Sequence, residues 1–165
     1  KSLIFDVRDN KGGVVKSATR ILDKLLPVGV ILQSIDKQEN ISVIASSDSN
    51  EVNLPMVVLV NSETASSAEL FAQALMDYDK AQSVGVATKG KSVMQSLIRL
   101  TDGSAIELTV GHYLSPNGTN LDKQGVKPSF EVTMEQDWQD LPEEFDLQLS
   151  KAIEVATTFI KEKLL

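Results

Sequence analysis

The residues Pro-Met-Val-Val-Leu-Val at positions 55–60 constrain the fold more than any other part of the chain. The run is short, continuous and rich in β-branched side chains, and no polar residue interrupts it. A strand of this kind leaves no face for solvent, so it belongs at the centre of a sheet that is covered on both sides. We therefore expect 55–60 to be a central strand.

Periodic patterns on both sides of this run predict alternating strands and helices. Apolar residues recur at helical spacing in three stretches: 14–26, where Pro27 ends the helix, 66–78 and 143–163. Short apolar or alternating stretches predict further strands, at 3–7 (buried), 29–36, 41–45, 82–86, 93–100 and 105–113. The fold class is therefore α/β, with mixed β-sheets flanked by helices.

Composition excludes several kinds of chemistry. The 165 residues contain 16 Lys and Arg against 23 Asp and Glu, a net charge of −7, which does not suit a nucleic-acid surface. There is no cysteine and only one histidine, so thiolate chemistry and a multi-histidine metal cage are excluded. We expect no nucleic-acid partner, no metal and no cofactor.

The segment 61–69 joins the best strand to the second helix, a place where open α/β folds often carry function. Ser66 followed by Glu69 has the spacing of a helix capping box. Alternatively, Ser66 is a nucleophile at a helix N-terminus, where free N–H groups stabilise an oxyanion. The spacing leaves both interpretations open.

A serine nucleophile needs a base, and two residues are candidates. His112 is the only histidine, but a lone histidine near the end of a strand is more often structural. Lys91 lies between Gly90 and Ser92, just before a predicted strand. A lysine acts as a base only in its neutral form, which burial and a second cation such as Lys89 favour. A solvated surface lysine is the alternative.

The segment 6–13 ends in Gly12 and Gly13 directly after a predicted strand. Two glycines let backbone N–H groups approach a ligand closely, although an ordinary strand-to-helix turn has the same composition. The Gly-Lys-Ser/Thr ending of a phosphate-binding loop does not follow.

Taken in order, these segments resemble the motifs of the carboxyl-terminal processing peptidases, also called tail-specific proteases. Residues 6–13 are similar to D-L-R-N-N-P-G-G, 61–69 to N-x-x-S-A-S-A-S-E, and 88–95 to T-F-G-K-G-x-x-Q. Shorter matches to family motifs follow at 102–105, 116–118, 125–128 and 146–152. The resemblance covers nearly the whole chain.

The resemblance implies a serine endopeptidase that works through a Ser-Lys dyad and an acyl-enzyme. By position, the nucleophile is Ser66 and the general base is Lys91, 25 residues later, which is the family's usual spacing. Gln95 matches the glutamine that orients the lysine, and Glu69 matches the acidic residue after the nucleophile.

The resemblance also implies an oxyanion hole made by the N–H of Ser67 and that of Gly12 or Gly13. The core is similar to the ClpP/crotonase superfamily. Ser67 and Ala68 stand where the family motif has Ala-Ser, and Lys89 replaces an aromatic residue.

We expect residues 1–165 to be a single catalytic domain, a fragment that lacks the upstream PDZ and N-terminal regions of the family. The family implies protein or peptide substrates with apolar C-termini, an extracytoplasmic location and homo-oligomers in the full-length protein. Two other functions stay open at this point. One is a crotonase-like acyl-CoA enzyme, and the other is an inactive relative that binds proteins.

Overall fold

The computed structural model describes residues 1–48, 50–135 and 138–162. Its α-helices are α1 (Val15–Leu25), α2 (Ser67–Asp77) and α3 (Leu147–Glu162). Two 3-10 helices are η1 (Trp138–Asp140) and η2 (Glu143–Phe145). The strands are β1 (Leu3–Asp6), β2 (Gly29–Asp36), β3 (Ile41–Ser47), β4 (Met56–Val60), β5 (Ala81–Gly85), β6 (Val93–Arg99), β7 (Ala105–Leu114) and β8 (Phe130–Glu131).

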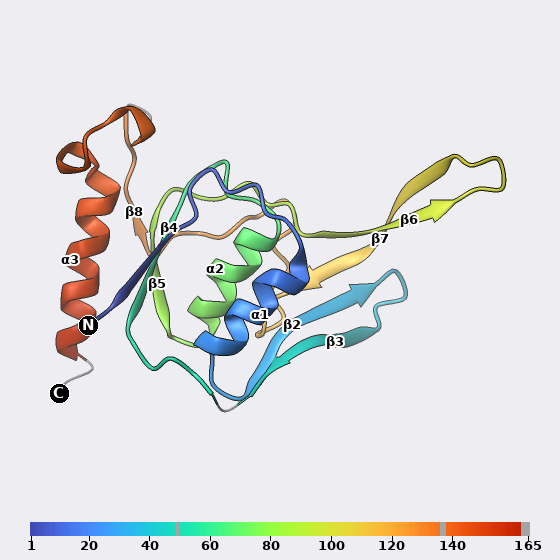
Figure 1. Ribbon diagram of the computed structural model, residues 1–165, viewed down its shortest axis with the longest axis horizontal. Helices are drawn as coiled ribbons and strands as arrows, with labels where there is room; N and C mark the ends of the chain where they lie inside the picture. The colour runs from blue at the N-terminus through green and yellow to red at the C-terminus, as the bar shows by residue number, and fades with distance from the viewer. Residues whose placement is uncertain (49, 136–137, 163–165) are drawn as a thin grey trace.

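The strands form two sheets (Figure 1). The first has the order β1-β4-β5-β8 and is parallel throughout. The second has the order β3-β2-β7-β6 and is antiparallel. Helix α3 covers one face of the parallel sheet, while α1 and α2 pack between its other face and the antiparallel sheet. The expected α/β class, with sheets of both kinds flanked by helices, is confirmed.

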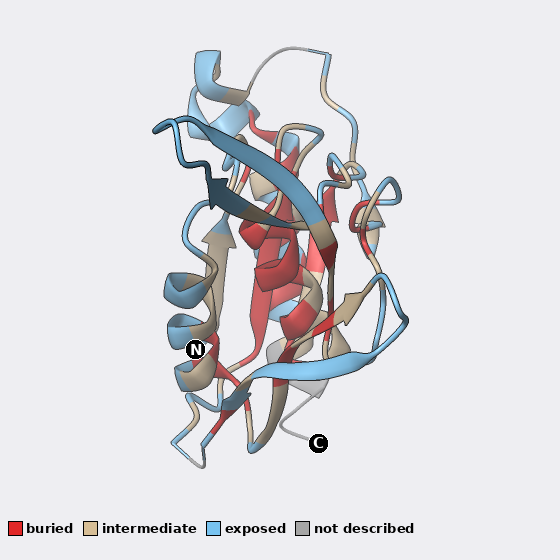
Figure 2. Ribbon diagram, turned by 90° about the vertical axis from the view of Figure 1, so that its right-hand side faces the viewer, coloured by how far each residue is buried: buried red, intermediate tan, exposed pale blue. Residues whose placement is uncertain are grey.

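Strand β4 is completely buried, as its uninterrupted apolar sequence predicts. Successive side chains of a strand point to opposite faces. Met56, Val58 and Val60 therefore pack against α1 and α2, whereas Val57 and Leu59 pack against α3. Each such side chain stabilises the fold by about 1.5–3 kcal/mol through burial. Figure 2 shows this buried centre around β4 and α2.

Three expectations about elements need correction. The strand expected at 3–7 is half-buried and not buried, because β1 lies at the edge of its sheet. The C-terminal helix begins at Leu147 and not at 143, because the Asp146 carboxylate accepts the Leu149 N–H (2.9 Å) and caps the helix there. Its expected end at 163 lies outside the described residues. The two-residue strand β8 was not expected.

The arrangement places the predicted functional segments together. In a parallel sheet the loops that follow the strands meet at one edge. The loops after β1, β4 and β5 lie at this edge, and they contain the glycine pair, Ser66 and Lys91. On the opposite side of the molecule from α3, the β6–β7 hairpin projects away from the body (Figure 1). Within the described residues, no helix combines the length and apolar character needed to cross a membrane.

Candidate active site

Ser66 occupies a strained turn between β4 and α2. Its backbone has φ +58° and ψ −126°, a region in which a residue with a side chain costs about 1–3 kcal/mol. Two hydrogen bonds hold the turn. The Ala65 N–H donates to the Asn10 carbonyl (2.9 Å), and the Ser66 N–H donates to Glu69 Oε2 (2.8 Å). Ser66 thereby stands, half-buried, directly before the N-terminus of α2. Sequence reasoning missed this strain, since no residue type in the segment signals it.

The carboxylate of Glu69 fastens two segments together. It is fully buried, and each of its oxygens accepts two hydrogen bonds. Oε2 accepts the N–H groups of Ser66 (2.8 Å) and Lys91 (2.9 Å), while Oε1 accepts the Gly90 N–H (2.7 Å) and the Thr88 hydroxyl (2.5 Å). The expected contact of Glu69 with the Ser66 N–H is confirmed. The three bonds to residues 88–91 were not expected, and Thr88 is a site residue that sequence reasoning missed.

Gly12 lies directly against the serine turn. Its φ is +86°, and a Cβ there would lie 2.7 Å from the Ala65 carbonyl oxygen and 2.8 Å from Ser66 Cβ. Only glycine fits this combination of backbone angle and close approach. The glycine loop therefore lies in close contact with the serine turn, and the role of its N–H groups in an oxyanion hole stays a prediction.

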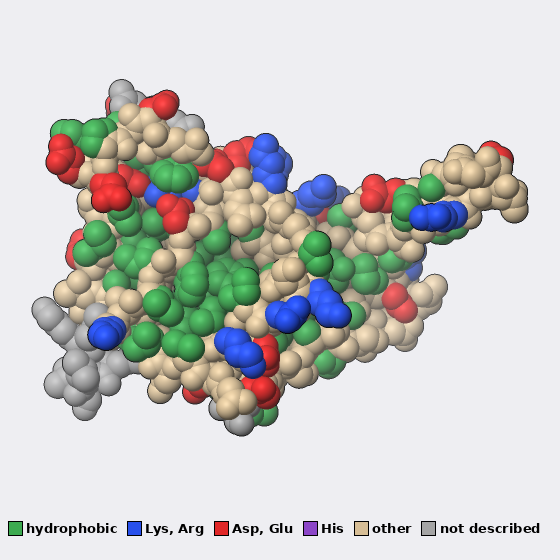
Figure 3. Space-filling model, in the orientation of Figure 1, with side chains coloured by type: hydrophobic (Ala, Val, Ile, Leu, Met, Phe, Trp, Pro, Cys, Tyr) green, Lys and Arg blue, Asp and Glu red, His purple; other side chains and the backbone are tan. Residues whose placement is uncertain are grey.

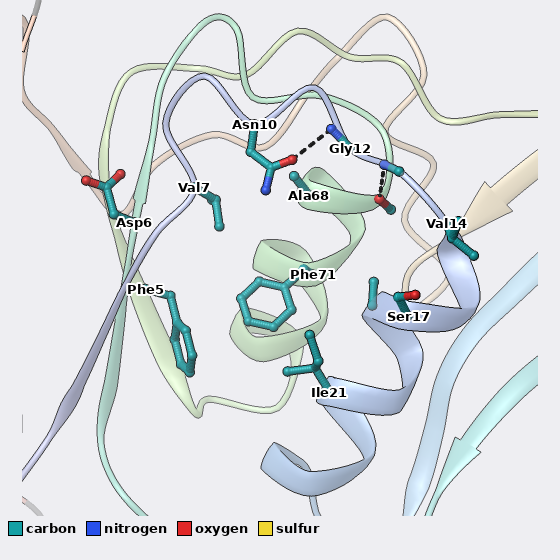
Figure 4. A pocket seen from close by; sticks show the side chains of 13 residues that line it. Phe5, Asp6, Val7, Asn10, Gly12, Val14, Ser17, Ile21, Ala68 and Phe71 are labelled. Atoms are coloured by element: carbon teal, nitrogen blue, oxygen red, sulfur yellow. Dashed lines mark hydrogen bonds between the residues drawn. The ribbon is translucent and has the colours of Figure 1, made fainter. Parts of the chain in front are cut away.

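The N–H groups of both glycines have side-chain acceptors (Figure 4). The Gly12 N–H donates to Asn10 Oδ1 (2.9 Å), and the Gly13 N–H donates to Ser67 Oγ (2.8 Å). The N–H of Ser67 itself has no acceptor among the described residues. The Ser67 N–H, at the start of α2, and one glycine N–H can together stabilise an oxyanion. The substrate then has to displace the side chain that now accepts this glycine N–H.

A cavity of about 360 Å³ opens beside the glycine pair. Gly12, Gly13 and Ser67 form part of its wall. The remainder is mainly apolar, with side chains from 5–7, from α1 and the residue before it, and from α2, namely Phe5, Val7, Val14, Ala18, Ile21, Ala68 and Phe71. Figure 3 shows hydrophobic side chains gathered over this face of the molecule. The cavity therefore suits an apolar group held next to the glycine pair and Ser67.

Lys91 corrects one expectation. The residue is exposed and not buried, although its backbone N–H donates to Glu69 and both Thr88 and Ser92 in the same segment are buried. Among the described residues, no hydrogen bond joins Lys91 Nζ to Ser66 Oγ or to Gln95. Gln95 lies exposed on β6, opposite Thr109 on β7. The structure thus brings the backbone of Lys91 to the site, while its amine makes no hydrogen bond to Ser66 within the part of the chain that the structure describes.

Lys89 and His112 each lie beside an acidic side chain. Lys89 Nζ lies 3.2 Å from the Glu63 carboxylate, so this carboxylate offsets the positive charge of Lys89. His112 lies on β7 opposite Val93, and its Nδ1 is 3.7 Å from the Asp122 carboxylate. No hydrogen bond connects His112 with Ser66 in the described part of the chain, which favours the structural interpretation of the histidine.

An ion-pair network centred on the buried Arg8 lies at the start of the glycine loop, residues 6–13. The Arg8 guanidinium, only 1% exposed, contacts the carboxylates of Asp6 (2.7 Å) and Asp146 (2.8 Å). Burial disfavours the Arg8 charge, but the hydrogen bonds with both carboxylates outweigh it and raise the pKa of Arg8. Burial also works against the charge of Asp146, yet Arg8 and the Leu149 N–H keep its pKa below the usual range. This network ties the end of β1 to the start of α3.

A second set of contacts holds the glycine loop through the side chain of Asp9. Asp9, with φ +58°, accepts hydrogen bonds from Asn61 (2.9 Å), Trp138 Nε1 (2.7 Å) and Gln139 (2.9 Å). The bond from Asn61 is the main reason that the pKa of Asp9 is lowered, with further contributions from Trp138 and Gln139. Arg8 also stacks over the Trp138 ring, 4.0 Å from its centroid. Sequence reasoning missed Trp138, because no local pattern relates it to a residue about 130 positions earlier.

The family model "Peptidase family S41" matches residues 1–132. A carboxyl-terminal-processing protease of Synechocystis is 36% identical over 125 residues, which is 76% of this chain and 29% of that protein. The carboxy-terminal processing protease CtpA of Bacillus subtilis is 32% identical over 143 residues, 86% of this chain and 30% of that protein. The chain thus spans less than a third of the length of these curated relatives.

Solved structures agree with the sequence comparisons. The structure of a photosystem II D1 C-terminal processing protease matches with a TM-score of 0.77 and 33% identity, covering 91% of this chain and 38% of that one. The structure of a lipoprotein from Streptococcus agalactiae matches with a TM-score of 0.76 and 24% identity, covering 96% of this chain and 55% of that one. This match supports the fold. On the match over residues 1–132 and these relatives, the chain belongs to peptidase family S41.

Proposed function

We propose that this chain forms the catalytic core of a serine endopeptidase of the carboxyl-terminal processing type. The observation that carries the proposal is the shared carboxylate of Glu69, which binds the backbone of Ser66 and of Lys91 at the same oxygen. This contact holds the turn of the nucleophile candidate next to the loop of the base candidate. The strained backbone of Ser66 and the glycine pair beside it add the parts that acyl transfer needs.

In the proposed reaction, neutral Lys91 takes the proton of Ser66 Oγ while the oxygen bonds to a peptide carbonyl carbon. The N–H groups of Ser67 and of Gly12 or Gly13 hold the oxyanion. The C–N bond then breaks, and the Lys91 ammonium returns its proton to the departing amine. Water attacks the ester by the same route and frees Ser66. Because Lys91 is exposed in the free protein, a substrate that covers it favours the neutral form.

The proposed substrates are protein C-termini with apolar residues. The apolar cavity beside the glycine pair supports this, since it takes a hydrophobic side chain next to the reacting carbonyl. One relative is named for processing the D1 C-terminus, and several relatives are chloroplastic. On these grounds we also propose an extracytoplasmic location for the full-length protein.

Hydrolysis of a C-terminally labelled peptide with apolar end residues by the full-length protein tests the proposal. Ser66→Ala and Lys91→Ala are each expected to lower kcat/KM by about a thousandfold or more. Lys127→Ala, which removes another exposed lysine, is the matched control and keeps the wild-type rate. Wild-type turnover in both Ser66→Ala and Lys91→Ala contradicts the dyad.

A second candidate function is protein binding without hydrolysis. The specific observation in its favour is that Lys91 is exposed and that, among the described residues, no hydrogen bond joins its amine to Ser66. A fluorophosphonate reagent separates the two functions, because it reacts only with an activated serine. A mass increase on the peptide that carries Ser66, absent in Ser66→Ala, supports the peptidase and contradicts the binding module.

A further inference from the structure

Ser67 is the residue of helix α2 whose side chain binds an N–H group of the glycine pair. Its hydroxyl oxygen accepts the Gly13 N–H at 2.8 Å, and it lies on the wall of the apolar cavity (Figure 4). The neighbouring Gly12 N–H is bound to Asn10, which comes from the same loop. Of the two glycine N–H groups, only that of Gly13 is therefore occupied by a residue of helix α2.

The position of this hydroxyl matches that of a reacting oxygen. An oxyanion is stabilised when it lies about 2.7–3.1 Å from its N–H donors. Ser67 Oγ stands within that distance of Gly13 N, immediately beside the residue that bears the proposed nucleophile. An oxyanion formed at Ser66 that uses the Gly13 N–H has to take the place that this hydroxyl holds.

We propose that the Ser67 hydroxyl is a place-holder for the substrate oxyanion, and that it has to leave Gly13 before the oxyanion hole can act. This inference rests on the proposed peptidase function. A serine hydroxyl can move by rotation about one bond, and the adjacent cavity borders the side chain. A charged oxygen binds an N–H group more strongly than a neutral hydroxyl does, so a developing oxyanion displaces it.

The displacement slows the reaction, because a hydrogen bond in the free protein is lost before the new one forms. A neutral hydrogen bond has a net worth that corresponds to about threefold to tenfold in an equilibrium constant. Removing the hydroxyl by Ser67→Ala is therefore expected to raise kcat/KM by about that factor. Alanine keeps the helix start intact because it is smaller and a strong helix former.

The test uses the full-length protein and a tripeptide aldehyde ending in alaninal, whose adduct with Ser66 carries an oxyanion. Ser67→Ala is expected to bind the aldehyde about threefold to tenfold more tightly than the wild type, and to exchange the Gly13 amide hydrogen faster. Thr19→Ala, which removes a hydroxyl from α1 outside the cavity, changes neither quantity.

Weaker or unchanged aldehyde binding by Ser67→Ala overturns the place-holder inference. If Ser66→Ala is inactive at the same time, the proposed peptidase function stands and only the inference fails. If Ser66→Ala hydrolyses the labelled peptide as fast as the wild type, the proposed function fails and the inference falls with it. The two failures are thus distinguished by one additional variant.

Discussion

The backbone N–H groups of Ser66 and Lys91 donate to the same oxygen atom, Oε2 of Glu69, at 2.8 and 2.9 Å. This contact bridges the turn before α2 and the loop before β6. Because Glu69 is fully buried, its carboxylate depends on these donors to replace water. The Glu69 carboxylate is therefore a direct link between the nucleophile and base candidates, and the bond from the Lys89 N–H to the Thr64 carbonyl (3.0 Å) joins the same two segments.

Glu69→Gln is expected to abolish this bridge. An amide group has one oxygen and turns two N–H donors towards backbone N–H groups, so buried donors on both segments lose their acceptor. We expect unfolding free energy to fall by about 2–5 kcal/mol, and kcat/KM to fall by more than about a hundredfold. Urea unfolding and peptide hydrolysis measure the two effects. The exposed pair of Lys151 and Glu154 gives the control, since Glu154→Gln is expected to change stability by less than about 0.5 kcal/mol.

Comparing Gly12→Ala with Gly103→Ala separates the effect of backbone strain from that of a steric clash. Gly12 and Gly103 both have positive φ values, +86° and +89°, so alanine at either position costs about 1–2 kcal/mol. At Gly12, the new Cβ also meets the Ala65 carbonyl and Ser66, whereas nothing lies within 4 Å of it at Gly103. We expect Gly12→Ala to lower kcat/KM at least about a hundredfold, because the loop and the serine turn move apart. Equal activity in the two variants contradicts this role of Gly12.

The sequence predicted most of the fold because its signals are local. The uninterrupted run at β4 predicted a central strand, and helical spacing with Pro27 predicted α1. The capping spacing of Ser66 and Glu69 predicted one of the four bonds of that carboxylate. The rest depends on long-range contacts, such as Trp138 on Asp9 and Asp146 on Arg8, which no local pattern encodes.

The side chain of Lys91 illustrates a different limit. A family motif places the residue in the loop before β6, and the bond from its N–H to Glu69 brings that loop to the turn of Ser66. Its burial was predicted from the chemistry that a base requires and not from the residues around it. Neighbouring residues in the loop are charged, glycine or small and polar, and they supply no apolar cover, so the residue is exposed.

The ion-pair network predicts the response of the protein to acid. The pKa of Asp146 is lowered in the folded state, so this carboxylate stabilises the fold above its unfolded pKa, about 3.9. That contribution is lost as the pH falls through the lower folded value. Asp146→Asn is expected to destabilise the protein by about 3–5 kcal/mol at pH 7, because Arg8 loses a buried partner. The variant also loses less stability than the wild type between pH 4 and pH 2, which urea unfolding across that range measures. If Asp146→Asn loses as much stability as the wild type over this pH range, Asp146 is not the source of the acid response.

The apolar cavity predicts how substrates are selected. Ile21 lines it from α1 and is 52% exposed, so a substrate side chain in the cavity covers apolar surface that water now reaches. Ile21→Glu places a charge there, and we expect kcat/KM for a peptide with an apolar end to fall about tenfold, or about 1.4 kcal/mol. Ile153→Glu is the matched control, because Ile153 is 53% exposed on α3, outside the cavity. The same loss in both variants would mean that surface charge, and not the cavity, determines the effect. A loss confined to Ile21→Glu, and larger for apolar than for polar peptide ends, identifies the cavity as the place where the substrate side chain binds.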